Sequence, residues 1–407
     1  MSEQKRIRVG YIGLGGRGQG MMQILLDMND VAVTAVCDLY EDRAREGVRL
    51  VEASGRPAPF CTLDYREVVS RDDVDCIFTP SSWTSHSTVM MAAMKAGKPV
   101  ATEVGGAASV QECWDLVHTA QETGTPCMMM ENCCYNREEM ALLNMVRQNV
   151  FGELVHCQGG YEHDLRAEVA RGIEQRHYRY HHYTHRNGDI YPTHALGPIA
   201  KLLNVNRGNR FISLSSFSSK TRGIHEWSLA NLGPDHCASK AEFLQGDVVT
   251  TVLICARGET VVLTHDTTLP RPYSRGLRVQ GTRGIFMEDN YSVYLEGRSL
   301  NLDQWDSFKD YLDEFDNPLW KKSDVANFKA GHGGMDYLIL RAFLEPVQAG
   351  LKDLPIDVYD VATWMAVTPL SEASIALGGQ PVAFPDFTNG SWTNRQPKPQ
   401  HLYTLER

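Results

Sequence analysis

The sequence has no segment able to cross a bilayer, no excess of positive charge and no paired cysteine motif. None of its apolar runs approaches the roughly 20 residues that span a membrane. It has 40 Lys and Arg residues against 50 Asp and Glu, a net charge of −10. This balance argues against a general nucleic-acid-binding protein, which needs a basic face to neutralise phosphates. We therefore expect neither nucleic acid nor membrane among the partners.

The cysteines and the N-terminal residues indicate a reducing compartment. The ten cysteines are scattered without a Cys-x-x-Cys pair, so we expect reduced thiols rather than a zinc or disulfide framework. Residues 1–6 lead into an apolar stretch without the apolar core of a secretory signal. The sequence therefore predicts a cytoplasmic protein, unless a secretory signal precedes residue 1.

The first third of the chain contains the pattern of a parallel sheet with crossover helices. Short apolar runs bounded by Gly, Pro, Asp or Asn alternate with stretches of helical periodicity. The predicted strands are 7–12, 31–37, 76–79, 99–103 and 127–131, and the predicted helices are 17–28, 41–54, 84–97 and 109–124.

Beyond about residue 150 the pattern changes to successive strands without helices between them. The predicted strands are 154–159, 211–217, 248–256, 260–268 and 277–280, several of them separated by tight turns. Such a run of strands favours an open, mainly antiparallel sheet in an α+β domain. Helical periodicity returns over 334–376, and we expect these helices to pack back on the first domain. The sequence thus predicts two domains, 1–135 and 136–407.

A glycine-rich turn follows the first predicted strand. Its sequence is Gly13-Leu14-Gly15-Gly16-Arg17-Gly18, and it leads into a helix. In a dinucleotide site Gly13 permits the tight turn, Gly15 lets the backbone approach the pyrophosphate, and Gly18 permits close packing of helix and strand. Asp38 ends the second strand, where it can bind a ribose diol and repel a 2′-phosphate. The pattern predicts a doubly wound Rossmann domain that binds NAD in preference to NADP.

The segment after the third strand, residues 80–86, has two interpretations. The carboxyl ends of parallel strands are where ligands bind in such sheets, so Trp83 could cover the cofactor and His86 could cap the next helix. Both side chains could equally be packing residues of a crossover loop.

Several longer motifs follow in a fixed order along the chain. They are Ala96-Gly97-Lys98-Pro99-Val100, Glu103-Val104, Asn132-Cys133-Cys134-Tyr135, Tyr161-x-His163-Asp164-Leu165-Arg166, Arg186 to His194 (RNGDIYPTH), Arg271-Pro272-Tyr273 and Gly331-His332-Gly333-Gly334-Met335-Asp336. Together with the glycine turn they resemble the Gfo/Idh/MocA oxidoreductases, and among these the branch known as glycoside hydrolase family 109. Enzymes of that branch are NAD-dependent glycosidases, described as α-N-acetylgalactosaminidases.

The sequence departs from its relatives at three places. Typical Gfo/Idh/MocA dehydrogenases have Glu-Lys-Pro where this chain has Glu103-Val104-Gly105, and that lysine assists at the reacting hydroxyl. Its absence argues against ordinary sugar-alcohol dehydrogenation. Within family 109, Gly105 replaces a frequent proline and Ala195 replaces a usual glycine. These two departures leave the sugar specificity open.

The resemblance implies two sets of contacts. Cofactor contacts are implied for Gly16, Arg17, Asp38, Trp83, Thr84, Ser85, His86, Glu103, Val104, Asn132 and Tyr191. Substrate contacts are implied for Tyr161, Arg179, Tyr191, Pro192, Thr193, His194 and Tyr273.

Nothing in the sequence marks the pair of carboxylates that a conventional glycosidase uses. A redox-neutral route needs no such pair: oxidation at sugar carbon 3, elimination, water addition and re-reduction. His194 is suited to deprotonate the 3-hydroxyl, and Tyr191 to orient the sugar or share the proton. Tyr161 is a candidate for the carbon-2 base or the leaving-group acid. Arg179 could bind ring hydroxyls or an acyl oxygen.

The sequence leaves four alternatives open and supports one expectation about assembly. The protein could be a net NAD-dependent sugar or glycoside 3-dehydrogenase, or a nucleotide-sensing regulatory protein. The histidines of 177–185 could bind a metal, although no Cys or patterned carboxylate completes a site and we predict none. The turn at 331–334 could abut the cleft or merely begin a helix. The open sheet favours a homo-oligomer, either a dimer or a tetramer.

Overall fold

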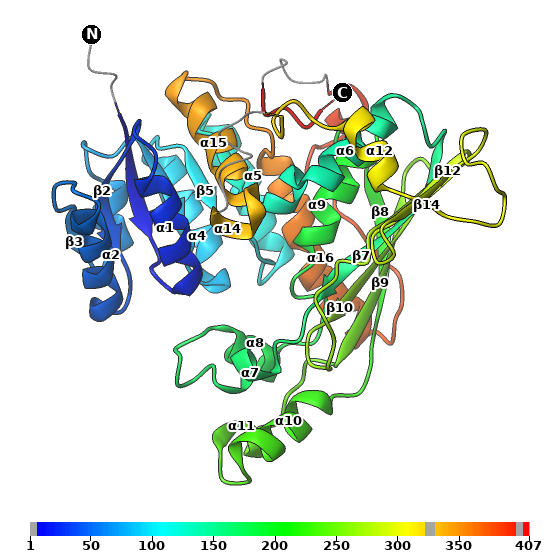
Figure 1. The fold of residues 1–407 in the computed structure, drawn as a ribbon. Helices are drawn as coiled ribbons and strands as arrows, with labels where there is room; N and C mark the ends of the chain where they lie inside the picture. Colours follow the sequence, from blue (N-terminus) through cyan, green and yellow to red (C-terminus); the bar gives the residue numbers. More distant parts are fainter. Residues whose placement is uncertain (1–5, 322–329, 396–401, 407) are drawn as a thin grey trace.

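The computed structural model describes residues 6–321, 330–395 and 402–406. Two sheets dominate it: a blue and cyan one formed by the first third of the chain and a green and yellow one from the remainder (Figure 1). Helices of the second part lie between them. In this described part of the chain no helix is both long and apolar enough to span a membrane.

The first sheet is the predicted Rossmann sheet. Its strands run in the order β3-β2-β1-β4-β5-β6 and pair in parallel. The strands are β1 (Ile7–Ile12), β2 (Val31–Cys37), β3 (Phe60–Thr62), β4 (Cys76–Thr79), β5 (Val100–Thr102) and β6 (Cys127–Met129). The intervening helices are α1 (Gly16–Leu26), α2 (Glu41–Ala53), α3 (Tyr65–Val69), α4 (Trp83–Lys95) and α5 (Val110–Thr123). β4, β5 and β6 are buried at every residue, as expected of strands covered on both faces.

The second sheet has nine strands in the order β14-β13-β12-β11-β7-β10-β9-β8-β15. They are β7 (Leu154–Glu162), β8 (Phe211–Ser218), β9 (Val248–Cys255), β10 (Thr260–Asp266), β11 (Arg278–Gly281), β12 (Gly284–Met287), β13 (Ser292–Leu295), β14 (Asp306–Ser307) and β15 (Val382–Ala383). β7 and β10 pair in parallel and the other pairs are antiparallel, which confirms the mainly antiparallel sheet. β9 and β10 alternate buried and half-buried residues, because one face packs on helices.

Helices from distant parts of the chain connect the two sheets. They are η1 (Asn132–Tyr135), α6 (Arg137–Arg147), α9 (Thr193–Leu202), α14 (Ala330–Gly333), α15 (Met335–Gln348) and α16 (Val358–Ala376). The amide of Ala107, before α5, donates to the carbonyl of Met365 in α16 over 3.2 Å. Arg341 of α15 forms an ion pair with Asp30, next to β2, over 2.9 Å. The chain therefore returns to the first sheet after completing most of the second.

Short helices extend below the two sheets in Figure 1. They are α7 (Arg166–Ala170), α8 (Arg179–His185), α10 (Gly223–Leu232) and α11 (Cys237–Lys240). The remaining elements are α12 (Lys309–Phe315) and η2 (Ser391–Thr393).

Candidate active site

The glycine-rich turn leaves open space where a dinucleotide would lie. Gly13 has φ +108°, and a Cβ there would lie 2.7 Å from the backbone of Ser81. A Cβ on Gly18 would collide with the carbonyl oxygen of Gly13, so both positions require glycine. A Cβ on Gly15 would have only Arg43 near it, at 3.8 Å, and one on Gly16 would have nothing within 4 Å. The turn is therefore closed toward the protein and open at the N-terminus of α1, where anions bind.

Asp38 stabilises the local backbone in addition to its predicted contact with a ribose. Its Oδ2 accepts a hydrogen bond from the amide of Leu14 over 2.7 Å, and its Oδ1 accepts one from the amide of Tyr40 over 2.9 Å. The carboxylate thus ties the end of β2 to the glycine turn. Each oxygen keeps a second lone pair, so a ribose diol can still bind to it.

Arg17 joins the glycine turn to two distant segments. Its Nε donates to Glu103 over 3.0 Å, and its Nη1 and Nη2 donate to the Asp336 carboxylate over 2.6 and 2.9 Å. Asn132 Nδ2 donates to the same carboxylate over 2.7 Å, and His332 Nδ1 lies 2.9 Å from it. Although burial opposes it, Arg17 and His332 hold the pKa of Asp336 well below its usual range. The structure thus brings together three predicted cofactor residues and adds Asp336 and His332 to them.

Trp83, the first residue of α4, lies among aromatic side chains. Its ring stacks on Tyr191 at 5.4 Å between centroids, and lies 4.9 Å from Tyr178 and 5.0 Å from His182. A Cβ on Gly105 would lie 3.0 Å from Trp83 Cγ and closer still to Cδ1 and Nε1 of the same ring. The glycine found in place of the frequent proline therefore provides the room for this indole ring.

The other residues of this loop form local contacts. The hydroxyl of Ser82 lies 3.0 Å from that of Thr84 and 3.3 Å from that of Ser85. His86 is buried, and its Nε2 lies 3.1 Å from the carbonyl oxygen of Ser81. Burial lowers the pKa of His86 to about 4, so its imidazole is neutral. Val104, also buried, follows Glu103 at the end of β5.

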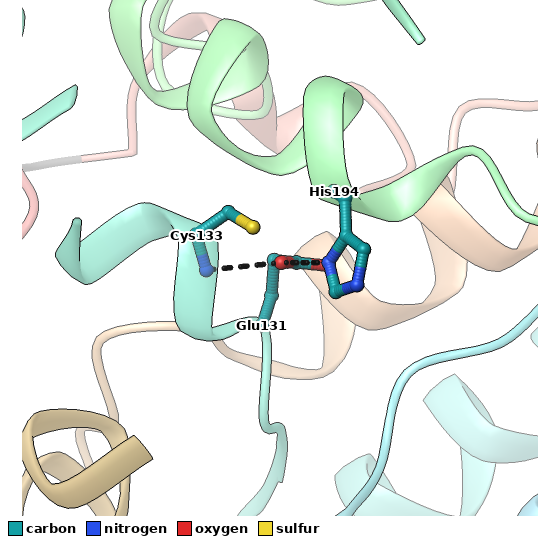
Figure 2. Close-up of side chains that lie close together, drawn as sticks. All are labelled: Glu131, Cys133 and His194. Atoms are coloured by element: carbon teal, nitrogen blue, oxygen red, sulfur yellow. Dashed lines mark hydrogen bonds and ion pairs between the residues drawn. The ribbon is translucent and has the colours of Figure 1, made fainter. Parts of the chain in front are cut away.

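His194 is held by a buried carboxylate. Its Nδ1 lies 2.7 Å from Oε1 of Glu131, which also accepts a hydrogen bond from the amide of Cys133 over 3.1 Å (Figure 2). Glu131 lies just beyond the end of β6, and His194 lies in the first turn of α9. The other imidazole nitrogen, Nε2, lies 3.3 Å from the hydroxyl of Tyr191. Although burial opposes it, Cys133 and Glu131 raise the pKa of His194 well above its usual range.

Tyr161 and Tyr273 lie beside this pair. Tyr161, near the end of β7, has its ring 4.4 Å from that of Tyr191 and 5.5 Å from that of His194. Its hydroxyl lies 3.1 Å from Nδ1 of His163. The ring of Tyr273 lies 6.2 Å from that of Tyr161, and its side chain is half exposed. The three predicted catalytic residues therefore form one cluster, with Tyr273 at its edge.

Arg179 closes the cluster from the side of α8. Its guanidinium lies over the rings of Trp83 and Tyr191, at 5.5 and 5.2 Å from their centroids. It also forms an ion pair with Glu168. Pro192 immediately precedes α9, and the buried Thr193 is the first residue of this helix, next to His194.

The histidines of 177–185 do not act as one group. His182 packs on Trp83, whereas His181 and His185 are exposed and lie 4.2 Å apart, ring to ring. His177 lies 3.7 Å from Glu168. The segment is a polar stretch beside the aromatic cluster of Trp83, Tyr178 and Tyr191.

Sequence reasoning missed Glu131 and gave Cys133 no role. A signal existed for Glu131, because it is the polar residue at the carboxyl end of the last parallel strand, the edge where ligands bind. The pairing with His194 could not be predicted, since it depends on how α9 of the second part packs against that edge. Ala195 shows the same dependence: its methyl group packs against Gly159 of β7, where a Cβ would lie 2.7 Å away.

Comparison with known proteins identifies both halves of the chain. Residues 7–131 match the model of the oxidoreductase family with an NAD-binding Rossmann fold. Residues 135–394 match the model of the C-terminal domain of glycosyl hydrolase 109.

Two relatives match over nearly the whole chain. A glycosyl hydrolase family 109 protein of Stenotrophomonas maltophilia is 42% identical, covering 97% of this chain and 91% of its own. An α-N-acetylgalactosaminidase of Tannerella forsythia is 41% identical, covering 96% of this chain and 88% of its own.

Solved structures share the fold at low sequence identity. A levoglucosan dehydrogenase in complex with NADH and levoglucosan has a TM-score of 0.72 at 16% identity, covering 94% of this chain and all of the other. An NAD-binding oxidoreductase of Klebsiella pneumoniae has a TM-score of 0.69 at 17% identity, covering 94% and 99%. These confirm the Gfo/Idh/MocA architecture, and the sequence matches are more specific: the chain belongs to glycosyl hydrolase family 109, with an NAD-binding Rossmann domain joined to the C-terminal sheet domain of that family.

Proposed function

We propose that this protein hydrolyses α-N-acetylgalactosaminides or related glycosides by a redox-neutral route. The sugar is oxidised at carbon 3, the carbon-1 substituent is eliminated together with the proton on carbon 2, water adds, and carbon 3 is reduced again. The observation that carries the proposal is the Glu131–His194–Tyr191 arrangement beside an open glycine turn. The family and the similar α-N-acetylgalactosaminidase support the substrate class.

The residues present fit NAD. The turn at Gly15 and Gly16 has room for a pyrophosphate, and Asp38 offers acceptors for a ribose diol. Trp83 presents a flat apolar surface near the aromatic cluster, and its indole Nε1 is without a partner among the described residues. When bound, NAD supplies reversible acceptance of a hydride from carbon 3.

His194 is the group that takes the proton of the 3-hydroxyl. The Nδ1–H group of His194 is donated to Glu131, so Nε2 is left to accept a proton. Nε2 lies 3.3 Å from the hydroxyl of Tyr191 and therefore faces that side chain. Glu131 positions the imidazole and stabilises its charged form. The same proton returns to the sugar when carbon 3 is reduced again, so the pair ends each cycle unchanged.

Tyr161 is assigned to the proton on carbon 2. Its hydroxyl lies 3.1 Å from His163, which can receive or return a proton. Arg179, stacked over Trp83 and Tyr191, is placed to hold ring hydroxyls or the acyl oxygen of an N-acetyl group.

The test is one incubation with two readouts. Purified protein is mixed with nitrophenyl α-N-acetylgalactosaminide, and nitrophenol release and the absorbance of reduced cofactor are followed together. Release of nitrophenol without net NADH supports the proposal. Net NADH with a free ketone product would instead establish a dehydrogenase. If neither nitrophenol nor NADH forms with a broad panel of glycosides, both the glycosidase and the dehydrogenase are overturned.

We also propose that the enzyme acts in the cytoplasm as a homodimer or homotetramer. The nine-stranded sheet carries exposed apolar residues on two of its strands, Val155 on β7 and Ile212 and Phe217 on β8. Light scattering of the purified protein measures the oligomeric state directly.

A further inference from the structure

Glu131, Cys133 and His194 lie close enough together to share one ion. A carboxylate oxygen, a thiol sulfur and an imidazole nitrogen, one from each residue, all lie within 4.8 Å of one another (Figure 2). Glu131 and Cys133 flank the first residue of η1, and His194 lies in the adjacent turn of α9. These three donor types are the protein ligands of Zn²⁺, and three of them with an open fourth position form a common type of zinc site.

A second observation points to a ligand at the same place. Glu131 is fully buried, yet its Oε2 has no hydrogen-bond partner in the described part of the chain. The nearby hydroxyl of Thr193 favours the charged carboxylate but makes no hydrogen bond of normal geometry with it. An unpaired buried carboxylate oxygen costs free energy, because water no longer solvates it. A cation chelated by both carboxylate oxygens of Glu131, with the thiol and the imidazole as its other ligands, would remove that cost.

We propose that Glu131, Cys133 and His194 bind one thiophilic divalent ion such as Zn²⁺ and that this ion inhibits the enzyme. The thiol loses its proton on binding, and the ion takes the place of the proton shared by His194 and Glu131. With Nδ1 bound to the ion, the imidazole carries its one proton on Nε2 and cannot accept another from the sugar. The inhibition rests on the proposed function, whereas the ion binding does not.

The rearrangement needed is small. His194 Nδ1 and Glu131 Oε1 are 2.7 Å apart, which is a hydrogen-bond distance. In a tetrahedral site with bonds of about 2.0 Å to nitrogen and oxygen, the two ligand atoms lie about 3.3 Å apart. A side-chain rotation that moves either ligand atom by about half an ångström provides this separation.

Cobalt titration of the NAD-loaded protein tests the binding. Co²⁺ takes the place of Zn²⁺ in such sites, and a cobalt–thiolate bond gives a near-ultraviolet charge-transfer band. We expect this band to saturate at about one Co²⁺ per chain and to disappear when Zn²⁺ is added. Absence of the band in the wild-type protein would overturn the proposal.

Single substitutions assign the band to this site. Cys133→Ser should abolish it and His194→Gln should weaken binding at least tenfold, with circular dichroism verifying that both variants are folded. Cys61→Ser is the matched control, because Cys61 is exposed on β3 and far from η1 in the chain, and it should leave the band unchanged. A band that survives in Cys133→Ser contradicts the proposal.

The inhibition is measured separately. Zn²⁺ should suppress nitrophenol release, and a chelator should restore it. A cobalt band without any glycosidase activity would leave the ion site standing and refute the proposed function. Full activity in the presence of a saturating band would refute the inhibition.

Discussion

Nδ1 of His194 lies 2.7 Å from the buried carboxylate of Glu131, and this pair joins the edge of the Rossmann sheet to the first turn of α9. The charge of Glu131 contributes to raising the pKa of His194, so the neutral imidazole that can accept a proton forms only toward higher pH. The rate of sugar oxidation should therefore rise with pH through that raised pKa.

Replacing Glu131 by Gln should move this rise to lower pH. The amide can still accept a hydrogen bond but no longer stabilises the charged imidazole, so the pKa of His194 falls. At high pH the variant should remain about 10²-fold slower, because the imidazole is less well oriented. A pH profile of nitrophenol release measures both effects, and an unchanged acid limb would refute the role of Glu131.

Gly15→Ala should weaken NAD binding at least tenfold without destabilising the protein. The backbone at Gly15 has φ −65°, which any residue adopts, and the nearest atom to a new methyl group is 3.8 Å away. Only a bound pyrophosphate would meet that methyl group. Gly20→Ala in α1, the helix that Gly15 precedes, is the control: nothing lies within 4 Å of a new methyl group there, and NAD should bind normally. Equal affinities in the two variants, measured by calorimetry, would place the pyrophosphate elsewhere.

Asp38→Asn should relax the preference for NAD over NADP by about tenfold. The substitution removes the charge that repels a 2′-phosphate. It also leaves one oxygen to accept from Leu14 or Tyr40, so we expect a modest loss of stability, about 1 kcal/mol. The ratio of the two dissociation constants is the measurement. A ratio identical to that of the wild-type protein would exclude a ribose contact.

Tyr161→Phe should uncouple oxidation from elimination. Because Tyr161 is assigned to the carbon-2 proton and His194 to the 3-hydroxyl, the variant should still reduce bound NAD in a single turnover. It should fail to exchange the carbon-2 hydrogen with D₂O and should release nitrophenol at least 10²-fold more slowly. Mass spectrometry of recovered sugar measures the exchange, and wild-type exchange in Tyr161→Phe would move the base to another residue.

Asp189→Asn should stabilise the protein at pH 8. Burial raises the pKa of Asp189 from 3.8 to about 7, against the amide of Tyr191, which lowers it. The folded state therefore binds this proton more tightly than the unfolded state, and stability falls as pH rises from about 4 to about 7. Asn keeps an acceptor and carries no charge, so it removes this loss, which for a pKa raised from 3.8 to about 7 is on the order of 4 kcal/mol at pH 8. Urea unfolding at pH 4 and pH 8 measures it; a gain of equal size at both would have another cause.

The long apolar strands and the glycine turn can be predicted from the sequence because their patterns are local. The predicted bounds of β1, β2 and β4 match the observed ones. β3 and the strands β12 to β15 escape prediction, since they are two to four residues long and are defined by their pairing partners. The predicted site residues come from ordered motifs. The three catalytic candidates lie in one cluster with Trp83 and Arg179. Arg17 instead links Glu103 to Asp336, which also binds Asn132.

Contacts between distant segments cannot be predicted in the same way. Asp336 is part of a recognised motif, but its ion pair with Arg17 joins residues 319 positions apart and depends on the packing of α15. Glu131 falls at the end of a predicted strand, and no pattern in the residues around it indicates that His194 is its partner. The same holds for Gly159 on β7 and Ala195 on α9: the glycine leaves the space that the alanine methyl group fills.

The Arg17–Asp336 pair has a consequence for how the protein is made. During synthesis the glycine turn leaves the ribosome early, while its carboxylate partner follows only after most of the chain has been translated. Until then Arg17 has at most Glu103 to neutralise it, and α5 lacks the cover that α16 later provides. A nascent chain arrested before residue 336 would therefore present an incomplete nucleotide edge, and the ability to retain NAD would be acquired near the end of translation.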